Sequence, residues 1–420
     1  TDRFGVKMPK RITTARWLWT IRNQPEKAKA TRHMTTPAGW IAYQLTGQWT
    51  LGIGDAAGMF PIDQATMHYD QTMLASFDAL VGETLVGEAP VGEAPVGEAL
   101  VPLVELLPTV RRAGEDGGAL SSAGSQILGL PEGIPVAPAE GDQPAALAGS
   151  LIGNAGMVSV SFGTSVCANS VGDRAFSGVS NGVDHFCAPD GKPINMVWLR
   201  NGTTFMNSVV EMFGDVLGED RAAGFDAMIP KLISADDDCG GLLALPFMDD
   251  EPGLGVSRGG TAMVIGLNAT NATPGNVVKA ALLSTMFNLK LGSEVLDAQG
   301  FPRTELILSG GLTRSPKLSQ LLADVFDTKV TLLDSAEEGT AWGAALMAKY
   351  RHEQVAGKEP AGQEPAGKER SWSEFLGEQP VASPTRFQPN PGAVAKLGEV
   401  YRKYKRLISV HPQLADALDG

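Results

Sequence analysis

The stretch Ala137-Pro-Ala-Glu-Gly-Asp-Gln-Pro-Ala-Ala-Leu147, followed by Val158-Ser-Val-Ser-Phe-Gly-Thr-Ser165, decides the fold that we expect for this chain. The first part predicts a short strand over 134–137 that leads to Asp142, just past a glycine. In the second part apolar residues alternate with serines, as in a half-buried strand that runs into a loop of glycine and hydroxyl groups. A carboxylate that accepts a proton from an alcohol, together with a loop that holds a phosphate, is what phosphoryl transfer to a hydroxyl group needs.

Asp142 is the candidate catalytic residue. Its carboxylate, placed at the end of a strand after Gly141, would face a cleft and serve as a general base for a hydroxyl group. The alternative is structural, because an aspartate is also a common cap for a helix, here one that begins near Pro144. From these residues alone the two interpretations have equal weight.

The loop of Gly163, Thr164 and Ser165 is a candidate phosphate site. Successive backbone N–H groups at a glycine turn, with two hydroxyl groups beside them, make a cradle for an anion. The same tripeptide also occurs in ordinary hairpins, so taken alone it favours the structural interpretation.

A second glycine loop, Ser309-Gly-Gly-Leu-Thr-Arg-Ser315, follows another predicted strand. Gly310 and Gly311 would let a nucleotide approach the backbone closely. Ser315 is predicted to cap a helix that starts at Pro316, and the free amides of that helix start would attract a phosphate. A plain strand-to-helix turn is the alternative, and neither glycine loop has the spacing of a P-loop.

The order of elements predicts α/β layers, because helices and strands alternate along most of the chain. Proline, glycine and the period of the apolar residues place the elements. The expected helices are 9–30, 37–47, 145–152, one that opens at Thr273-Pro274, one that opens at Ser315-Pro316, and 341–347. The expected strands are 134–137, 158–162, 305–309 and 329–333, and residues 54–63 are expected to form a loop that enters a short strand.

Composition and charge exclude several classes of function. The chain has 420 residues, enough for two or three domains, and 43% of them are hydrophobic. Its formal net charge is −13 and Lys/Arg clusters are missing, so we expect no nucleic-acid partner. No apolar run has the length of a membrane span and the N-terminus has no signal-peptide core, so we expect no membrane partner and a cytoplasmic location.

The remaining residue types predict no metal centre and no buried repeat architecture. Cys167, Cys187 and Cys239 have no metal-ligand spacing and are expected to be reduced thiols, and the five histidines form no metal-like cluster. The unit Val-Gly-Glu-Ala-Pro recurs over 82–100, and a similar stretch covers 356–370. A repeat of five residues buries nothing, so both stretches are expected to be surface insertions.

Taken in order, these motifs resemble the FGGY family of carbohydrate kinases, which includes xylulose, ribulose, gluconate and glycerol kinases. The resemblance covers nearly all of residues 10–350, and its strength lies in the order and spacing of motifs that are weak one by one. The motifs are Trp40-Ile-Ala-Tyr-Gln-Leu-Thr-Gly with Gly54-Asp-Ala-Ala-Gly; Gly141-Asp-Gln with Ala145-Ala-Leu; Ser161-Phe-Gly-Thr-Ser; Leu308-Ser-Gly-Gly-Leu-Thr-Arg-Ser with Glu338-Gly-Thr-Ala-Trp-Gly-Ala-Ala; and Gly266-Leu-Asn with the helix after Thr273.

This resemblance implies two actin-like domains, each with a ribonuclease-H-like core, around a central cleft that closes on ATP, Mg²⁺ and a sugar or polyol. It implies that 1–148 is the remaining part of the N-terminal sugar-binding domain and 149–420 the C-terminal nucleotide-binding domain, and a homodimer is common in the family. It makes Asp142 the general base and places Gln143 beside it at the substrate. The implied nucleotide contacts are Gly163, Thr164, Ser165, Gly310, Gly311 and Ser315.

One feature of the family is missing from the sequence. The family opens with an Asp-x-Gly-Thr turn, whose carboxylate helps to hold Mg²⁺, and with a segment that carries several sugar contacts; residues 1–40 contain no such turn. The N-terminal domain is therefore expected to be incomplete, either because this is a truncated form of a longer kinase or because half of the site is lost.

Two functions follow from these expectations. The first is an ATP-dependent sugar kinase, with a pentulose such as xylulose as the expected substrate, and Asp142 favours it. The second is a non-catalytic actin-like module that binds nucleotide or sugar, or an inactive kinase fragment, and the missing carboxylate favours that interpretation.

Overall fold

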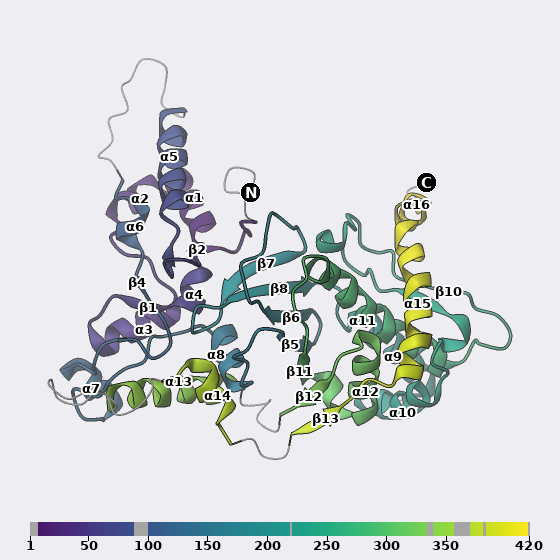
Figure 1. The fold of residues 1–420 in the computed structure, drawn as a ribbon. Helices are drawn as coiled ribbons and strands as arrows, with labels where there is room; N and C mark the ends of the chain where they lie inside the picture. Colours follow the sequence, from purple (N-terminus) through teal and green to yellow (C-terminus); the bar gives the residue numbers. More distant parts are fainter. Residues whose placement is uncertain are drawn as a thin grey trace.

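The structure is a computed structural model that describes residues 7–87, 100–218, 221–333, 339–356, 370–380 and 384–418. Two lobes are visible in Figure 1: a smaller, mostly helical lobe built from the first part of the chain, and a larger lobe around a seven-stranded sheet. Both insertions predicted from the low-complexity stretches, 82–100 and 356–370, lie mostly outside the described residues.

The smaller lobe is a set of short helices around the parallel strand pair β1 and β4. Its core contains Leu51, Ile53, Phe60 and Val110, each almost completely buried. The elements are α1 (Thr13–Asn23), α2 (Pro25–Ala30), α3 (Pro37–Thr46), β1 (Thr50–Gly52), α4 (Ile53–Ala57), β2 (Ile62–Asp63), β3 (His68–Tyr69), α5 (Gln71–Gly87), α6 (Leu103–Leu106), β4 (Thr109–Arg111) and α7 (Ser122–Leu128).

The larger lobe is built on one mixed sheet with the strand order β13-β12-β11-β5-β6-β8-β7. Its centre is parallel, because β11 pairs in parallel with both β5 and β12, and its outer pairs are antiparallel. The strands are β5 (Met157–Phe162), β6 (Val166–Val171), β7 (Val183–Cys187), β8 (Pro193–Leu199), β11 (Glu305–Gly310), β12 (Val330–Leu332) and β13 (Thr385–Phe387), and β9 (Leu243–Leu245) pairs separately with β10 (Met263–Ile265).

Helices cover this sheet, and the long helix α11 is buried along most of its length. The helices are α9 (Thr204–Leu217), α10 (Arg221–Ser234), α11 (Pro274–Ala298), α12 (Pro316–Phe326), α15 (Pro391–Ser409) and α16 (His411–Asp416), with the short 3-10 turns η1 (Cys239–Gly241), η2 (Pro252–Leu254) and η3 (Gly311–Arg314). The predicted helix that opens at Thr273-Pro274 is confirmed as α11, and its residues Val278, Leu282, Met286 and Leu289 are all completely buried.

Three helices, α8 (Asp142–Gly149), α13 (Gly339–Ala356) and α14 (Trp372–Gly377), lie close together in the region between the lobes (Figure 1). Here α8 and α13 are in backbone contact. A Cβ atom added to Gly149 would lie 1.8 Å from the carbonyl oxygen of Gly339, and one added to Gly343 would lie 1.8 Å from that of Ala145. Only glycine at these positions lets the two helices approach so closely.

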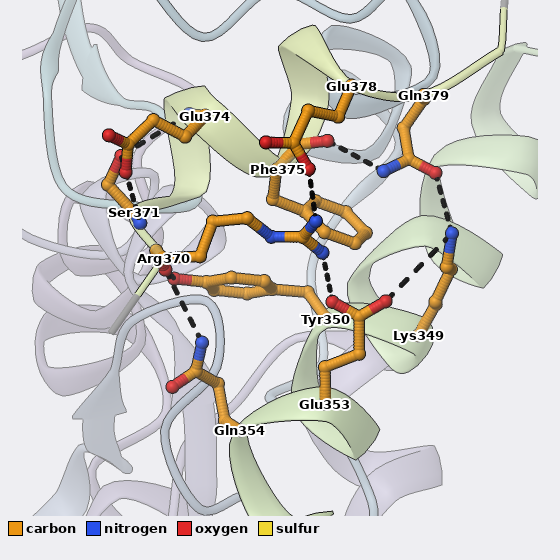
Figure 2. A network of polar contacts seen from close by, with 10 residues as sticks. All are labelled: Lys349, Tyr350, Glu353, Gln354, Arg370, Ser371, Glu374, Phe375, Glu378 and Gln379. Carbon is orange, nitrogen blue, oxygen red and sulfur yellow. Dashed lines mark hydrogen bonds and ion pairs between the residues drawn. The ribbon is translucent and has the colours of Figure 1, made fainter. Parts of the chain in front are cut away.

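A polar network ties α13 to α14 (Figure 2). Arg370 forms ion pairs with Glu353 of α13 and with Glu378, and its guanidinium carbon lies 4.9 Å from the centre of the Phe375 ring. Lys349 Nζ donates a hydrogen bond to Gln379 Oε1 at 2.9 Å. The helix that contacts α8 is therefore also in contact with α14 and the residues after it.

Three predicted elements are wrong. The helix expected over 9–30 is split between α1 and α2, because Pro25 has no N–H group and restricts the residue before it. The strand expected over 134–137 is reduced to an isolated bridge at Pro135, since that proline cannot donate to a ladder. The start of the loop expected over 54–63 is the helical turn α4, although the short strand after it is confirmed as β2.

Candidate active site

Asp142 is the first residue of α8, after Gly141 at the N-cap position, and its side chain is exposed. The helix predicted over 145–152 thus begins three residues earlier than expected, and Asp142 belongs to the helix rather than to the end of a strand. Its Oδ1 accepts a hydrogen bond from the N–H of Gln143 at 2.8 Å. The carboxylate therefore also serves the helix start, where N–H groups lack partners within the helix.

The segment that leads to Asp142 is held against the end of β1 by backbone and side-chain bonds. Gly52 N donates to Ala139 O at 2.7 Å. The Glu140 carboxylate accepts from Gly54 N at 3.0 Å and from Asp55 N at 2.6 Å. Strand β1 and helix α4 thereby fix the position of the α8 start.

A cleft of about 340 Å³ opens in front of Asp142. Both lobes line it: Arg11, Asp55, Asp142 and Gln143 come from the first part of the chain, and Asn169 comes from β6 of the large sheet. Asn169 Nδ2 donates to Gln143 Oε1 at 3.4 Å, which links α8 to that sheet. The rest of the lining is mostly small or apolar, namely Pro9, Ile12, Gly54, Gly58, Gly141, Pro144, Leu147, Phe186, Cys187, Ile194 and Met196.

Asp55 is a second carboxylate in this cleft, and the sequence assigned it no role. Thr36 Oγ1 donates to its Oδ2 at 2.6 Å. Burial raises the pKa of Asp55, the Thr36 hydrogen bond opposes this rise, and the nearby charge of Asp142 adds to it. The only sign of Asp55 in the sequence was its place in the motif Gly54-Asp-Ala-Ala-Gly. That motif resembles one of the FGGY family, but no function was assigned to it.

Glu140 is a third carboxyl group at this point and is half-buried. Burial raises its pKa to about 8; the hydrogen bonds from Gly54 N and Asp55 N oppose the shift, and the charge of Asp55 adds to it. At neutral pH the group is therefore mostly protonated. Sequence reasoning missed it, because nothing near Glu140 indicates that its partners lie 86 and 85 residues away in the chain.

Arg11 also lines the cleft but is tied to the large sheet. It forms an ion pair with Oδ2 of Asp184 on β7. The other carboxylate oxygen of Asp184, Oδ1, lies 2.7 Å from Lys7 Nζ. The Asp184 side chain is only 5% exposed, so this pair of cations neutralises a buried charge. The segment before α1 is thereby anchored across the cleft.

The two glycine loops lie side by side on the large sheet. The parallel pairing of β5 with β11 sets Ser161 opposite Ser309 and Phe162 opposite Gly310, so the loops that follow both strands leave the same edge. Gly310 has φ +82°, and a Cβ atom there would lie 2.5 Å from the carbonyl oxygen of Phe162. This close approach and the left-handed conformation both require glycine.

The first loop is a hairpin turn between β5 and β6, with Gly163 and Thr164 exposed and Ser165 half-buried. Its carbonyl groups face the start of α9: Gly163 O accepts from Thr203 N at 2.9 Å, and Thr164 O accepts from Gly202 N at 2.9 Å. Gly163 N donates to Ser165 O at 3.0 Å within the turn. That N–H is therefore already used, and an anion at this loop would depend on the groups of Thr164 and Ser165.

The second loop continues into η3 and α12, as the sequence predicted in outline. Ser315 is the N-cap residue of α12 and Pro316 follows at the first helical position. The predicted cap bond is wrong, because the Ser315 side chain accepts no hydrogen bond from the helix start. Gly311 is exposed and Ser315 half-buried at this edge.

The structure thus brings the predicted residues together as two groups rather than one. Asp142 and Gln143 share the cleft with Asp55, and the loop residues 163–165 and 310–315 share the edge of the sheet. Among the residues that line the cleft, none comes from either loop. The bond between Gln143 and Asn169 joins the two groups, since Asn169 lies on β6, the strand that follows the first loop.

A larger hollow, of about 840 Å³, lies elsewhere and contains none of these residues. Three of the arginines that line it are paired with carboxylates, Arg112 with Glu115, Arg351 with Asp116 and Arg370 with Glu353. We therefore place the candidate site at the smaller cleft.

Within the ranges given above, no group of three or more His, Cys, Asp or Glu side chains could hold a metal ion. The three cysteines are free, as predicted. Across the same ranges, no helix combines the length and the apolar character that crossing a bilayer demands.

Comparisons with known proteins show what this chain is similar to. Residues 158–352 match the FGGY family of carbohydrate kinases, C-terminal domain. The chain is 22% identical to the xylulose kinase of Haemophilus influenzae, over 83% of this chain and 65% of that protein. It is 30% identical to the glycerol kinase of Koribacter versatilis, over 58% of this chain and 47% of that protein. The chain thus spans less than two thirds of the length of either relative.

The fold is that of solved sugar kinases. The structure of xylulose kinase from Rhodospirillum rubrum superposes with a TM-score of 0.76 at 20% identity, over 98% of this chain and 74% of that chain. The expected α/β architecture, with two actin-like lobes of ribonuclease-H-like type around a cleft, is therefore confirmed. On the match of residues 158–352 and of its fold, the chain is similar to the FGGY family of carbohydrate kinases.

Proposed function

We propose that this chain is an ATP-dependent carbohydrate kinase that transfers the γ-phosphate to a hydroxyl group of a sugar. The observation that carries the proposal is the position of Asp142 at the start of α8, facing a cleft lined by both lobes. The two glycine loops at the edge of the neighbouring sheet provide a separate place for a nucleotide. Closure of the lobes would bring these two groups of residues together.

In the proposed reaction, the Asp142 carboxylate takes the proton from the attacking hydroxyl group. The hydroxyl oxygen forms a bond to the γ-phosphorus as the bond from that phosphorus to the β,γ-bridging oxygen breaks, and ADP leaves. Gln143 and Asp142 would contact the sugar. The nucleotide would be held by Gly163, Thr164, Ser165, Gly310, Gly311 and Ser315. Such catalysis rests on positioning and on charge neutralisation.

Mg²⁺ fits the donor chemistry of the cleft. Asp55 and Asp142 offer hard carboxylate oxygens, and Mg²⁺ is usually bound by one or two carboxylates together with water and substrate phosphates. The ion, when bound, would neutralise charge on the phosphates during transfer.

The substrate we propose is a pentulose such as xylulose. Xylulose kinases support this choice both as a relative and as a solved structure, while the likeness to a glycerol kinase keeps polyols among the candidates. We further propose that 1–148 form part of a sugar-binding domain and 149–420 the nucleotide-binding domain.

A release assay for ADP tests the function. The chain is incubated with ATP, Mg²⁺ and, in turn, D-xylulose, D-ribulose, gluconate and glycerol. We expect turnover with a pentulose and a loss of at least about 100-fold in Asp142→Asn, the usual size of general-base catalysis. Glu132→Gln, a change of an exposed carboxylate outside the cleft, is the matched control and should keep full activity.

The second candidate is a nucleotide- or sugar-binding module without catalysis. It is favoured by the separation of the two groups of residues, since the loops do not line the cleft of Asp142. Binding of ATP measured by calorimetry, without turnover of any of the four substrates, would select this function.

A further inference from the structure

The two faces of the large sheet can be told apart on strand β8. Val197 faces the long helix α11, because a Cβ atom added to Gly292 of that helix would lie 2.8 Å from Val197 Cγ1. Side chains alternate along a strand, so Met196 and Trp198 project from the opposite face. Met196 lines the candidate cleft together with Leu147 of α8. Trp198 therefore lies on the side of the sheet that carries the candidate site.

Trp198 ends a row of four side chains that crosses this face. Residues that pair directly on neighbouring strands project to the same side of a sheet. The pairing gives the order of the row, which is Ser309 of β11, Ser161 of β5, Cys167 of β6 and Trp198 of β8. Ser309 and Ser161 are each the last residue but one of their strands, next to the glycine loops. The row thus connects the loops with the rim of the cleft.

Exposure distinguishes this row from the next one. Trp198 is 40% exposed, whereas Asn169 and Met196, which pair in the next row, are 6% and 9% exposed. Strand β8 lies between β6 and β7 inside the sheet (Figure 1), and tryptophan is highly buried on average. Pockets for small molecules are lined mostly by apolar and aromatic side chains. An uncovered indole at this position is therefore suited to contact a ligand.

We propose that Trp198 is a further substrate-contact residue, whose indole forms the wall of the sugar site on the side of the glycine loops. The inference rests on the proposed function, since it assigns Trp198 to the acceptor of that reaction. The flat ring would cover the C–H groups of the sugar, while the hydroxyl groups of the sugar meet Asp142 and Gln143.

The same wall would keep water away from the reacting centre. Without it, a water molecule can take the place of the sugar. The water oxygen then forms a bond to the γ-phosphorus, its proton passes to the Asp142 carboxylate, the bond to the β,γ-bridging oxygen breaks, and ADP and inorganic phosphate leave. Exclusion of water from a closed site prevents this side reaction. Loss of the indole should therefore turn part of the sugar kinase activity into hydrolysis of ATP.

The kinetic test measures ADP and sugar phosphate separately in the same reactions, with ATP, Mg²⁺ and the sugar that turns over best. In Trp198→Ala we expect KM for the sugar to rise about tenfold and ADP to exceed sugar phosphate, because the contact and the shielding are both lost. Trp198→Phe keeps a ring and should restore most of both. The matched control is Trp19→Ala, since Trp19 of α1 is 41% exposed and is not part of the cleft lining. This control should form the two products in equal amounts.

The second test needs no turnover. Tryptophan emission is followed while D-xylulose is added, in the presence of ADP, to the unchanged chain, to Trp198→Phe and to Trp19→Phe. We expect the sugar to change the emission of the unchanged chain and of Trp19→Phe, and to leave that of Trp198→Phe nearly constant. Calorimetry of the same additions should show weaker binding of D-xylulose to Trp198→Ala than to the unchanged chain.

The outcomes separate this inference from the proposed function. If no sugar is phosphorylated but the emission of Trp198 responds to D-xylulose, the kinase proposal fails and the contact stands. The inference is overturned if Trp198→Ala keeps both the KM for the sugar and the ratio of ADP to sugar phosphate, or if Trp198→Phe keeps the full change in emission. A rise in KM for ATP alone would place the indole at the nucleotide and would overturn the inference as well. Thermal melts of each variant separate a loss of fold from a loss of contact.

Discussion

Gly343 of α13 lies so close to Ala145 of α8 that a Cβ atom on the glycine would come within 1.8 Å of the alanine carbonyl oxygen. Ala145 is three residues after Asp142, so the contact lies within the first turn of the helix that carries the candidate base. The position of Asp142 therefore depends on a helix from the far end of the chain.

We predict that Gly343→Ala pushes α8 and α13 apart. The added Cβ would clash with backbone atoms, which cannot move away as a flexible side chain can. We therefore expect the free energy of unfolding to fall by about 1–3 kcal/mol. Urea denaturation measures it. The control is Gly398→Ala in α15, where an added Cβ meets no atom within 4 Å. That change should be neutral or stabilise by up to about 1 kcal/mol. Equal effects of the two variants would contradict the prediction.

The two glycines of the second loop should differ in their tolerance of a side chain. Gly310→Ala places a Cβ 2.5 Å from Phe162 O at a left-handed backbone position, whereas at Gly311 the nearest contact would be 3.9 Å. We expect Gly310→Ala to lower the free energy of unfolding by about 1–3 kcal/mol more than Gly311→Ala. Thermal melts of both variants check this, and a smaller loss for Gly310→Ala would show that β5 and β11 do not meet as described.

Glu140 should make stability depend on pH. Its pKa is raised from 4.5 to about 8 in the folded protein, so between these values the folded state holds a proton that the unfolded state has released. The stabilisation from this group is thus complete below about pH 4.5 and is lost as the pH rises through about 8.

The variant Glu140→Gln tests this titration. The amide has no proton to lose, so the decline in stability between these pH values should become shallower, while the loss of one acceptor costs about 1 kcal/mol. Urea denaturation at a series of pH values measures both effects. An unchanged slope would mean that Glu140 does not titrate in this window.

The ion pairs of Arg370, which Figure 2 shows, should contribute little to the free energy of unfolding. Arg370 is 32% exposed and Glu378 60% exposed, so water and salt screen their attraction. We expect Arg370→Met, which keeps the apolar stem over Phe375, to cost less than about 1 kcal/mol and less still at high salt. A loss of several kcal/mol in urea denaturation would show that the network fixes α13 more strongly than its exposure indicates.

The elements predicted best were those with local signals. Alternating residues marked β5, and Thr273-Pro274 marked the start of α11, where the Thr273 side chain accepts a hydrogen bond from Asn276 N. Gly47 ends α3 in the left-handed conformation, as expected. The wrong predictions came where proline or long-range packing decides the secondary structure, as at Pro25 and over 134–137.

The candidate site residues named from the sequence were also those with local signals. Asp142 could be named as a candidate because it follows a glycine, although the sequence placed it at the end of a strand and the structure places it at the start of α8. Asp55 and Glu140 could not, because their roles come from contacts between segments about 85 residues apart. The separation of the glycine loops from the cleft could not be predicted either, since it depends on the relative placement of the two lobes and not on any sequence motif.

The most direct test of the central claim is the phosphorylation of D-xylulose followed by ³¹P NMR, with ATP and Mg²⁺, in the unchanged chain and in Asp142→Asn. We predict a sugar phosphate signal that grows with time in the unchanged chain, and a rate at least about 100-fold lower in Asp142→Asn, with both proteins equally folded. Equal rates in the two proteins would contradict the claim that Asp142 is the catalytic base, and no sugar phosphate from the unchanged chain would contradict the claim that it is a kinase for this sugar.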